Sequence, residues 1–457
     1  MAAEILWVLG SAAWLAHQRR SPAGTLAWIL ALAALPLVGI PVYLVLGPRR
    51  LERKRLRIRR VQRDRAAYLA ACQPQAPGDP QLARLATRLG ALPPETAGAL
   101  SLHFDGDGWL SAVEAAIREA RHHVHLEFYI FEAGPTGARV RDALVEAARQ
   151  GVEVRLLVDD AGSPRHRRRF LRPLLDAGAE VARFNPILFR LRRGAANFRS
   201  HRKIVVCDGR VGLTGGINVS DDQSAAIRGA AAWRDTGLRL DGPAVHGLQL
   251  AFREDWAFAT GRSIPATAAY FPASPEGTRL VQIVPSGPDQ SPPAAALLYP
   301  AAIAAARERI RITTPYFVPD EPLLTALASA ALRGVDVQII LPARTDAWLV
   351  DAASRSYRDP LAAAGVGLHL YGPAMVHAKT CVVDRTVALV GSANLDSRSL
   401  RLNFEITALL HDPEAVEVLA AQFQRDLAHT CRAPREREAG LGRRLLASIA
   451  RLLAPQL

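Results

Sequence analysis

The chain is 457 residues long, enough for roughly three domains with buried cores. With 57 Lys and Arg against 43 Asp and Glu, its formal net charge is +14, which favours an anionic partner: nucleic acid, an acidic membrane surface or a phosphorylated substrate. The four cysteines lack CxxC and His-interleaved spacing, which excludes a cysteine-based zinc motif, and they do not require an oxidising compartment.

The N-terminal part of the chain is strongly apolar. Thr25–Gly47 contains 23 residues and no charge, which is long enough for a membrane-spanning helix, and Pro36 and Pro41 are expected to kink it. Ile5–Ala16 is a shorter uncharged stretch that either crosses the membrane or lies in its interface. A cleaved signal peptide is disfavoured, because no basic residue precedes the apolar run and no clean cleavage site follows it.

A dense basic cluster follows this apolar part. Ten Lys and Arg lie between Arg49 and Arg65, against two on the other flank of the predicted span. The positive-inside bias therefore predicts that everything after Pro48 lies in the cytoplasm. The cluster is expected to contact anionic headgroups, with on the order of 1 kcal/mol for each charge near the surface. Residues 1–60 are thus predicted to hold membrane segments and a basic juxtamembrane region.

Two segments of the remaining chain match each other in order and type. HHVHLEFYIF begins at His122 and ERIRITTPYF begins at Glu308, and each is followed by an Ala/Leu-rich stretch, a glycine and a second β-rich run. Gly151 and Gly334 occupy the place where a helix ends in the left-handed conformation. The strand–helix–strand order predicts a parallel, largely buried sheet in each segment.

The repeat predicts the domain organisation. We expect two homologous α/β halves at 98–265 and 266–430, each with a mostly parallel sheet flanked by helices, packed about a pseudo-two-fold axis and preceded by N-terminal membrane helices. Residues 431–457 form a basic amphipathic tail, in which Gly442–Ala454 places five Leu and Ile on one helical stripe. That helix either docks on the core or lies on the membrane.

The leading strand of the first half opens with three histidines, His122, His123 and His125. Their alternation is compatible with a metal site. A solvent-exposed entry into the strand is the favoured interpretation.

The strongest signal is a spacing that the chain contains twice, in HRKIVVCDGRVGLTGGIN from His201 and HAKTCVVDRTVALVGSAN from His377. Each copy holds a histidine, a lysine two residues later, an aspartate seven later and an asparagine seventeen later. These residues are His201, Lys203, Asp208 and Asn218 in the first copy and His377, Lys379, Asp384 and Asn394 in the second.

Composition singles out the two lysines of this spacing. The chain has three lysines beside 54 arginines, and two of the three are Lys203 and Lys379. Arginine is therefore used wherever charge alone suffices, and these two sites require a compact ammonium on a flexible stem. A structural duplication preserves spacing but does not by itself protect lysine from replacement by arginine.

Alternate residues of a strand share a face, so each histidine points the same way as its lysine. Two halves that face each other would bring together two imidazoles, two ammonium groups and two amides, a set that suits a phosphodiester. Lys203, Lys379, Asn218 and Asn394 would bind the phosphate oxygens while one imidazole attacks phosphorus and the other protonates the leaving oxygen. No metal cofactor is expected, because no Asp/Glu cluster suggests a divalent cation and a His-bound zinc would need a third ligand.

Each imidazole needs an acceptor that fixes its tautomer. Asp235 and Glu405 follow their histidines by 34 and 28 residues, in apolar runs, and we assign each to the imidazole of its own half. Asp208 and Asp384 fall on the opposite face of the strand, where an anchoring role is favoured although they complete the repeated spacing.

The paired HxKxxxxD motifs with GGIN and GSAN resemble the phospholipase D superfamily. Together with the apolar N-terminus and the WRDT, TPYFVPD and NFEI segments, they resemble bacterial cardiolipin synthases over nearly the whole chain. The resemblance implies metal-independent phosphatidyl transfer through a covalent phosphatidyl-histidine, with His201 as nucleophile and His377 as acid and then base, and it counts Asp208 and Asp384 in the catalytic set. It also implies phosphatidylglycerol as the substrate, a location in the bacterial inner membrane and a cytoplasmic catalytic region.

Two alternatives remain open. A hydrolytic phospholipase D would use the same residues with water as acceptor. A nuclease of the same superfamily fits the basic charge, but the apolar N-terminus and the lack of aromatic residues within the basic stretches disfavour it, so nucleic acid is not expected as a partner. The sequence also leaves open whether phosphatidylethanolamine replaces the second phosphatidylglycerol.

Overall fold

The fold was analysed in a computed structural model. It describes residues 2–17, 22–34, 39, 43, 47, 79–163, 168–186, 197–275, 277–435 and 440–452. The strands are β1 (Glu95–Ala97), β2 (Leu100–His103), β3 (His123–Phe128), β4 (Glu153–Asp159), β5 (Glu180–Phe184), β6 (Ile204–Cys207), β7 (Val211–Gly215), β8 (Gly237–Asp241), β9 (Arg279–Ser286), β10 (Arg309–Thr313), β11 (Phe317–Val318), β12 (Asp336–Pro342), β13 (Gly367–Tyr371), β14 (Thr380–Val383), β15 (Val387–Gly391), β16 (Leu395–Asp396), β17 (Glu405–Leu410) and β18 (Thr430–Arg432).

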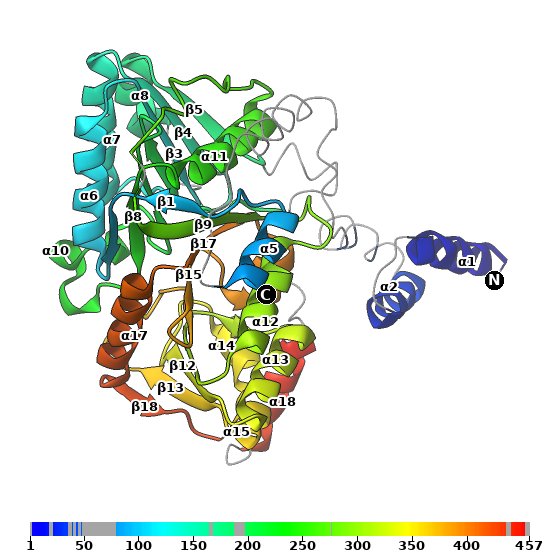
Figure 1. The fold of residues 1–457 in the computed structure, drawn as a ribbon. Coiled ribbons are helices and arrows are strands. Elements are labelled where there is room, and N and C mark those ends of the chain that lie inside the picture. Colours follow the sequence, from blue (N-terminus) through cyan, green and yellow to red (C-terminus); the bar gives the residue numbers. More distant parts are fainter. Residues whose placement is uncertain are drawn as a thin grey trace.

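Helices flank the strands of both halves (Figure 1). They are α1 (Ala2–His17), α2 (Pro22–Ala34), α5 (Pro80–Arg88), α6 (Gly106–Glu119), α7 (Pro135–Arg149), α8 (Arg168–Asp176), α10 (Ala225–Arg228), α11 (Val245–Thr260), α12 (Ala294–Ala305), α13 (Glu321–Leu332), α14 (Trp348–Arg355), α15 (Arg358–Ala364), α16 (Ser397–Arg401), α17 (Pro413–Leu427) and α18 (Leu441–Leu452), with short 3-10 turns η2 (Asp221–Gln223) and η3 (Gly229–Ala231).

Two sheets of matching topology confirm the duplication. The first has the strand order β2-β8-β7-β6-β3-β4-β5, and the second repeats it as β9-β17-β15-β14-β10-β12-β13. The second sheet also takes β1 and β18 at its edges, so nine strands face seven. β1 precedes the first half in the chain, yet it pairs antiparallel with β9 of the second sheet.

The expectation of mostly parallel sheets is wrong. Only β3, β4 and β5 run parallel to one another in the first sheet, and only β10, β12 and β13 in the second. The remaining strands form antiparallel meanders, because each HxK strand turns back within a few residues, at Asp208 in one half and Asp384 in the other. The Asp-Gly pair that follows Cys207 is a hairpin signal in the sequence.

The apolar cores divide the molecule into five layers. One core joins α6, α7 and α8 to the outer face of the first sheet, and another joins α12, α13 and α15 to the outer face of the second. Between the sheets, α11 and α17 pack with inward side chains of β6, β8, β15 and β17 in a shared core. Figure 1 shows the first half above the second, with β9, β17 and β15 between them. Across this core, β15 contacts β7 and β8, and β17 contacts β7.

Local sequence explains where the paired helices begin and end. Asp320 is the N-cap residue of α13, and Asp412 is that of α17. The side chain of each aspartate accepts a backbone N–H of the first turn. After α7 and α13 the chain turns through Gly151 and Gly334, whose φ angles are 88° and 90°, as predicted for a left-handed helix end.

The histidines of the leading strand are not at an exposed strand entry. His123 and His125 are fully buried, and only His122 faces solvent. β3 pairs with strands on both sides and is covered by α11, so His125 stacks on Phe252 with 4.5 Å between ring centroids and its Nδ1 contacts Gln249 at 3.1 Å. Burial lowers the pKa of His123 to about 3. These side chains are therefore neutral core residues.

The N-terminal helices α1 and α2 pack against each other. Leu15, Leu32 and Tyr43 are buried between them, and the indole N–H of Trp7 donates to the Leu32 carbonyl at 3.1 Å. Within the described residues, none of the helices has the length and apolarity that crossing a membrane requires. The predicted span Thr25–Gly47 begins in α2, and most of its later residues lie outside the described part of the chain. The whole basic cluster after Pro48 also lies outside the described part.

Candidate active site

The two histidine segments are each held by a backbone segment of the other half. The His201 amide donates to the Phe404 carbonyl at 2.8 Å, next to a parallel β-bridge between the two segments. The second half repeats this arrangement, because the His377 amide donates to the Arg234 carbonyl at 2.7 Å beside an equivalent bridge. Both histidines thus lie at the junction of the halves, just before β6 and β14.

The imidazoles are paired with carboxylates across this junction. His201 Nδ1 lies 3.0 Å from Glu405 Oε2, and His377 Nδ1 lies 2.6 Å from Asp235 Oδ2. The structure places both predicted acceptors, Asp235 and Glu405, against an imidazole, but the assignment of each to the imidazole of its own half is wrong. The reason is the crossed bridges: the WRD segment runs beside the second histidine and the NFE segment beside the first.

The tautomer of each imidazole follows from this pairing. A carboxylate only accepts hydrogen bonds, so Nδ1 carries the proton and Nε2 keeps its lone pair. In His377 that Nε2 lies 3.1 Å from the Lys379 ammonium, which donates to it. Burial lowers the pKa of both imidazoles despite the facing carboxylates, and it lowers that of His377 to about 3, with Lys379 adding to the effect. Burial alone would raise the pKa of Asp235 and Glu405, yet the neighbouring cations and hydrogen bonds hold both below their usual values. The site therefore pairs neutral imidazoles with ionised carboxylates.

Lys203 and Lys379 are buried side by side with the histidines. Lys203 Nζ donates to the His201 carbonyl at 2.6 Å, and Lys379 Nζ donates to the His377 carbonyl. Burial and the charge of Lys379 lower the pKa of Lys203 to about 7, and burial lowers that of Lys379 to about 8. The two HxK pairs hence belong to one electrostatic cluster, and a bound anion would stabilise its ammonium charges.

The two carboxylates have different surroundings. Glu405 accepts from the Ser392 hydroxyl and from Asn403 Nδ2 at 3.3 Å, whereas Asp235 accepts from its neighbour's backbone N–H at 2.7 Å. Gly216 holds the place of Ser392 in the first repeat, and a Cβ there would fall 2.1 Å from Asp235 Oδ1. The difference between GGIN and GSAN is therefore a fit to the acid that each half itself supplies to the imidazole of the other half.

The asparagines of the spacing are buried beside the site. Asn218 Oδ1 accepts from the Ile130 amide at 3.3 Å, which leaves its NH₂ group for another acceptor. Asn394 is 5 % exposed. Their contact with phosphate oxygens stays a prediction.

Asp208 and Asp384 do not approach the imidazoles. Asp208 occupies a turn with a φ of 55°, and its carboxylate accepts the backbone N–H groups of Arg121, His122 and His123 at 2.8–2.9 Å. Asp384 repeats this with residues 307–309. Both aspartates thus tie the hairpin turn to the strand entry, which supports the anchoring role and not direct participation in catalysis.

Three aromatic side chains that sequence reasoning did not single out line the histidines. The Tyr129 ring lies 5.0 Å from that of His201, Trp233 lies 4.9 Å from His377, and Tyr316 lies 6.3 Å from His377. Trp233 lies in the WRDT segment and Tyr316 in the TPYFVPD segment. Their place next to these motif residues is the feature of the sequence from which they could have been predicted.

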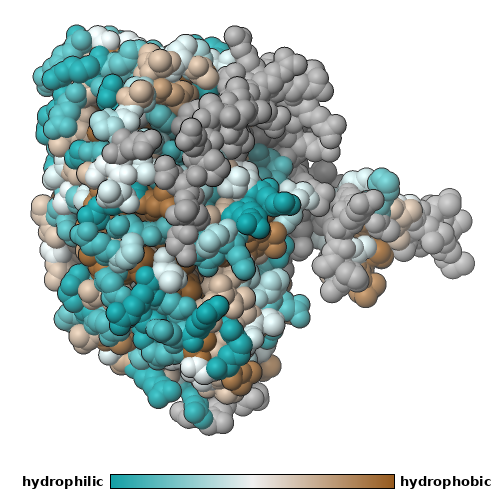
Figure 2. Space-filling model, in the orientation of Figure 1, coloured by the Kyte–Doolittle hydropathy of each residue, from teal (hydrophilic) through white to brown (hydrophobic). Residues whose placement is uncertain are grey.

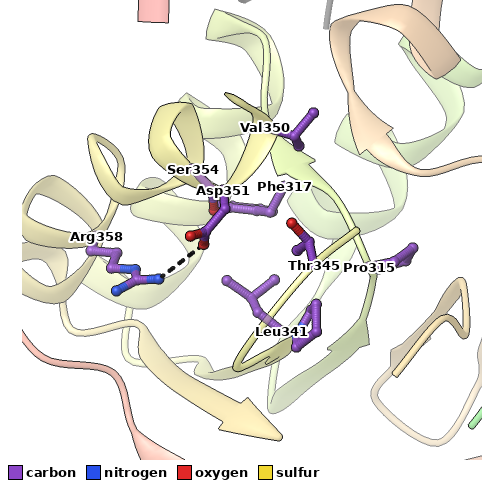
Figure 3. A pocket seen from close by; sticks show the side chains of 9 residues that line it. Pro315, Phe317, Leu341, Thr345, Val350, Asp351, Ser354 and Arg358 are labelled. Atoms are coloured by element: carbon purple, nitrogen blue, oxygen red, sulfur yellow. Dashed lines mark ion pairs between the residues drawn. The ribbon is translucent and has the colours of Figure 1, made fainter. Parts of the chain in front are cut away.

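A pocket lies behind the Tyr316 turn. Figure 3 shows Pro315, Phe317 and Leu341 on its walls, and Asp351 paired with Arg358 at 4.0 Å across its floor. Its charges are matched within the pocket, and no residue of the histidine cluster lines it. Elsewhere in the described part of the chain, no cluster of three or more His, Cys, Asp or Glu side chains is arranged to hold a metal ion.

Comparisons with known proteins agree with this geometry. Residues 113–255 and 299–427 match the family described as cardiolipin synthase, PLD-like domain, and residues 5–48 match the phospholipase D-nuclease N-terminal family. The chain is 36 % identical to cardiolipin synthase 1 of Bacillus cereus over 96 % of its length and 90 % of that protein. It is 37 % identical to cardiolipin synthase of Geobacillus kaustophilus over the same shares.

A solved structure shares the fold. Phosphatidylserine synthase of Haemophilus influenzae superposes with a TM-score of 0.63, covering 82 % of this chain and all of that one, at 15 % identity. At this identity, the likeness concerns the arrangement of the two halves.

Proposed function

The chain belongs to the family of cardiolipin synthases with phospholipase D-like domains, and we propose that it converts two molecules of phosphatidylglycerol into cardiolipin and glycerol. The observation that carries this proposal is the identity of 36–37 % to cardiolipin synthases along 96 % of the chain. The histidine cluster contains the groups that phosphatidyl transfer needs. It has two histidine–carboxylate pairs and two buried ammonium groups.

In the first half-reaction, His201 Nε2 attacks the phosphorus of a phosphatidylglycerol. The new P–N bond forms as the P–O bond to the headgroup glycerol breaks, and His377 gives its Nε2 proton to the departing oxygen. Lys203 and Lys379 stabilise the charge on the non-bridging oxygens. The phosphodiester anion offsets the ammonium charges that hold down the pKa of His377, so substrate binding favours the protonated acid.

In the second half-reaction, a hydroxyl of another phosphatidylglycerol enters where glycerol left. His377, now neutral, takes the hydroxyl proton, and the oxygen attacks phosphorus as the P–N bond to His201 breaks. Cardiolipin leaves and both imidazoles return to their starting states. Glu405 keeps the His201 proton on Nδ1 throughout, so that Nε2 alone is available for the covalent bond.

The polarity of the site supports His201 as the nucleophile. On the His377 side, Tyr316 donates its hydroxyl proton to Asp346, an exposed carboxylate that also acts electrostatically on Lys379. On the His201 side, the carboxylate near Tyr129 is Asp159, which is buried and already paired with Arg199 and with backbone N–H groups, and Arg398 also lies near Tyr129. Carboxylate oxygens accept hydrogen bonds from glycerol hydroxyls, so both the leaving and the incoming glycerol group suit the side on which His377 lies.

The apolar N-terminus and the basic cluster support a location in the bacterial cell membrane, with the catalytic region in the cytoplasm. Contact with anionic lipids follows from the same cluster.

Thin-layer chromatography of labelled phosphatidylglycerol with purified enzyme tests the proposed reaction. Cardiolipin with an equal amount of glycerol is expected, and the yield is expected to survive excess EDTA. Phosphatidic acid as the main product would favour the hydrolytic phospholipase D instead, and activity that only added Mg²⁺ or Zn²⁺ restores would contradict the metal-free mechanism.

A further inference from the structure

The C-terminal helix α18 is attached to the second half by its small residues. It packs along α14, where Ala447 and Ala450 are 4 % and 1 % exposed. The Arg451 guanidinium lies over the Tyr357 ring at 5.1 Å from its centroid, which fixes the rotation of the helix. The orientation of α18 is therefore set by contacts within the chain.

This attachment leaves the large apolar side chains of α18 on the outside. Leu445, Leu446, Ile449 and Leu452 are 54, 46, 59 and 78 % exposed. They follow the i, i+1, i+4, i+7 spacing of one helical face, opposite Ala447 and Ala450. Figure 2 shows hydrophobic surface over the region that α18 occupies in Figure 1. A helix that only filled the core would turn these side chains inward.

The charges of the helix indicate what covers this face. α18 contains Arg443, Arg444 and Arg451 and no acidic residue. A helix with an apolar stripe and only positive charges has the composition of one that lies in the interface of an anionic bilayer. A second copy of the chain is a poorer partner, because two copies of a helix whose charges are all positive repel each other.

We propose that α18 docks the second half on a surface of anionic phospholipid through Leu445, Leu446, Ile449 and Leu452. The two expectations for this helix are then both partly right, since it docks on the core with one face and contacts lipid with the other. The proposal rests on the proposed function only in that the substrates are membrane lipids.

Docking by α18 also orients the active site. α14, on which it packs, begins at Trp348, whose side chain is 69 % exposed. Trp348 follows Asp346, the acceptor of the Tyr316 hydroxyl, by two residues. The helix that holds α18 thus starts beside the His377 side of the site, where glycerol groups enter and leave in the proposed reaction.

Quenching by brominated lipid tests the contact directly. Ile449→Cys would carry an environment-sensitive fluorophore in a full-length chain with Cys72→Ser and Cys431→Ser, in which the remaining thiols, Cys207 and Cys381, are buried. The chain would be reconstituted in vesicles of phosphatidylserine and phosphatidylcholine with brominated acyl chains. We expect strong loss of fluorescence at position 449 and little at the matched control Val418→Cys, an exposed apolar site on α17.

Equal quenching at 449 and 418 would overturn the proposal. So would a fluorescence change at 449 that needs no lipid and grows with protein concentration, because a second copy would then cover the helix. The readout does not depend on turnover, so a chain that quenches at 449 but makes no cardiolipin contradicts the proposed function alone.

A second measurement links the contact to activity. The pair Leu445→Gln and Ile449→Gln is expected to lower turnover of vesicle-bound substrate several-fold while turnover in detergent micelles is unchanged. The matched pair Leu175→Gln and Val418→Gln, which removes two exposed apolar side chains elsewhere, should lower neither. Loss of vesicle turnover in both pairs to the same extent would assign the effect to general surface apolarity and refute a specific role of α18.

Discussion

Nδ1 of His201, in the first half of the chain, lies 3.0 Å from the carboxylate of Glu405, in the second. The reverse pair, His377 and Asp235, makes the same contact in the other direction. Neither half therefore contains a complete histidine–carboxylate pair of its own. Each half supplies the carboxylate for the histidine of the other half. The backbone bridges that position these carboxylates also join the two halves.

Separate substitutions of the two carboxylates should reveal the crossing. With a p-nitrophenyl phosphatidyl ester, the leaving group needs no acid, so only the nucleophile and its carboxylate limit the first burst of nitrophenol. Glu405→Gln is expected to slow that burst by on the order of 100-fold or more, because His201 loses the partner that holds its tautomer. Asp235→Asn should retain the burst and lose the later transfer.

A pairing within each half would produce the opposite result, with the burst lost in Asp235→Asn and retained in Glu405→Gln. Glu417→Gln provides the control, because Glu417 is a partly exposed glutamate on α17 that contacts Arg309 and lies outside the histidine cluster.

Asp208→Ala tests whether the aspartate of the repeated spacing acts in chemistry. Its loss leaves three backbone N–H groups without their acceptor, so the free energy of unfolding should fall by about 1–3 kcal/mol. Turnover per folded molecule should remain close to wild type. Chemical denaturation and active-site titration measure the two quantities. An unchanged stability with abolished turnover would place Asp208 in the reaction instead.

Lys203→Arg and Lys379→Arg are expected to lower kcat/KM by on the order of 100-fold although each keeps a positive charge. Both ammonium groups are fully or almost fully buried and donate to the carbonyl of the histidine two residues earlier, where a planar guanidinium does not fit. Steady-state rates on phosphatidylglycerol measure the effect, with the exposed Arg210→Lys as a control. Near wild-type rates for both arginine variants would refute the argument from the scarcity of lysine.

The depressed pKa values of the lysines predict an alkaline loss of substrate affinity. In the free enzyme Lys203 and Lys379 lose their protons near pH 7 and pH 8, so raising the pH from 7 to 9 removes the charges that bind phosphate. A bound anion raises both pKa values, which protects the complex. We therefore expect kcat/KM to fall across this range by more than kcat does, because the bound anion keeps the lysines protonated in the complex. A kcat/KM that is constant from pH 7 to 9 would contradict the electrostatic account.

The two homologous halves and the residue types of the site could be predicted from the sequence, because both follow from a short residue spacing that occurs twice. His201 and Lys203 lie two residues apart just before β6, and His377 and Lys379 lie two residues apart just before β14, so the relative directions within each pair follow from residue numbers. Which carboxylate meets which imidazole could not be predicted in this way. Glu405 is 204 residues from His201, and only the packing of the two sheets brings them together.

Sheet direction was misjudged for a related reason. The strand–helix–strand units from β3 to β5 are parallel, as the sequence pattern indicates, but the hairpins at Asp208 and Asp384 reverse the strands that carry the catalytic residues. The burial of His123 and His125 was missed because their surroundings come from α11, more than a hundred residues later in the chain.

The central claim is that one site built from both halves carries out transfer through a phosphatidyl group on His201. The most direct measurement treats His377→Ala with the p-nitrophenyl phosphatidyl ester and locates the adduct by mass spectrometry of digests kept away from acid. The variant lacks the base that activates the second hydroxyl, so a phosphatidyl adduct should accumulate on His201. An adduct on His377 in the His201→Ala protein, with none on His201 in His377→Ala, would contradict the assignment.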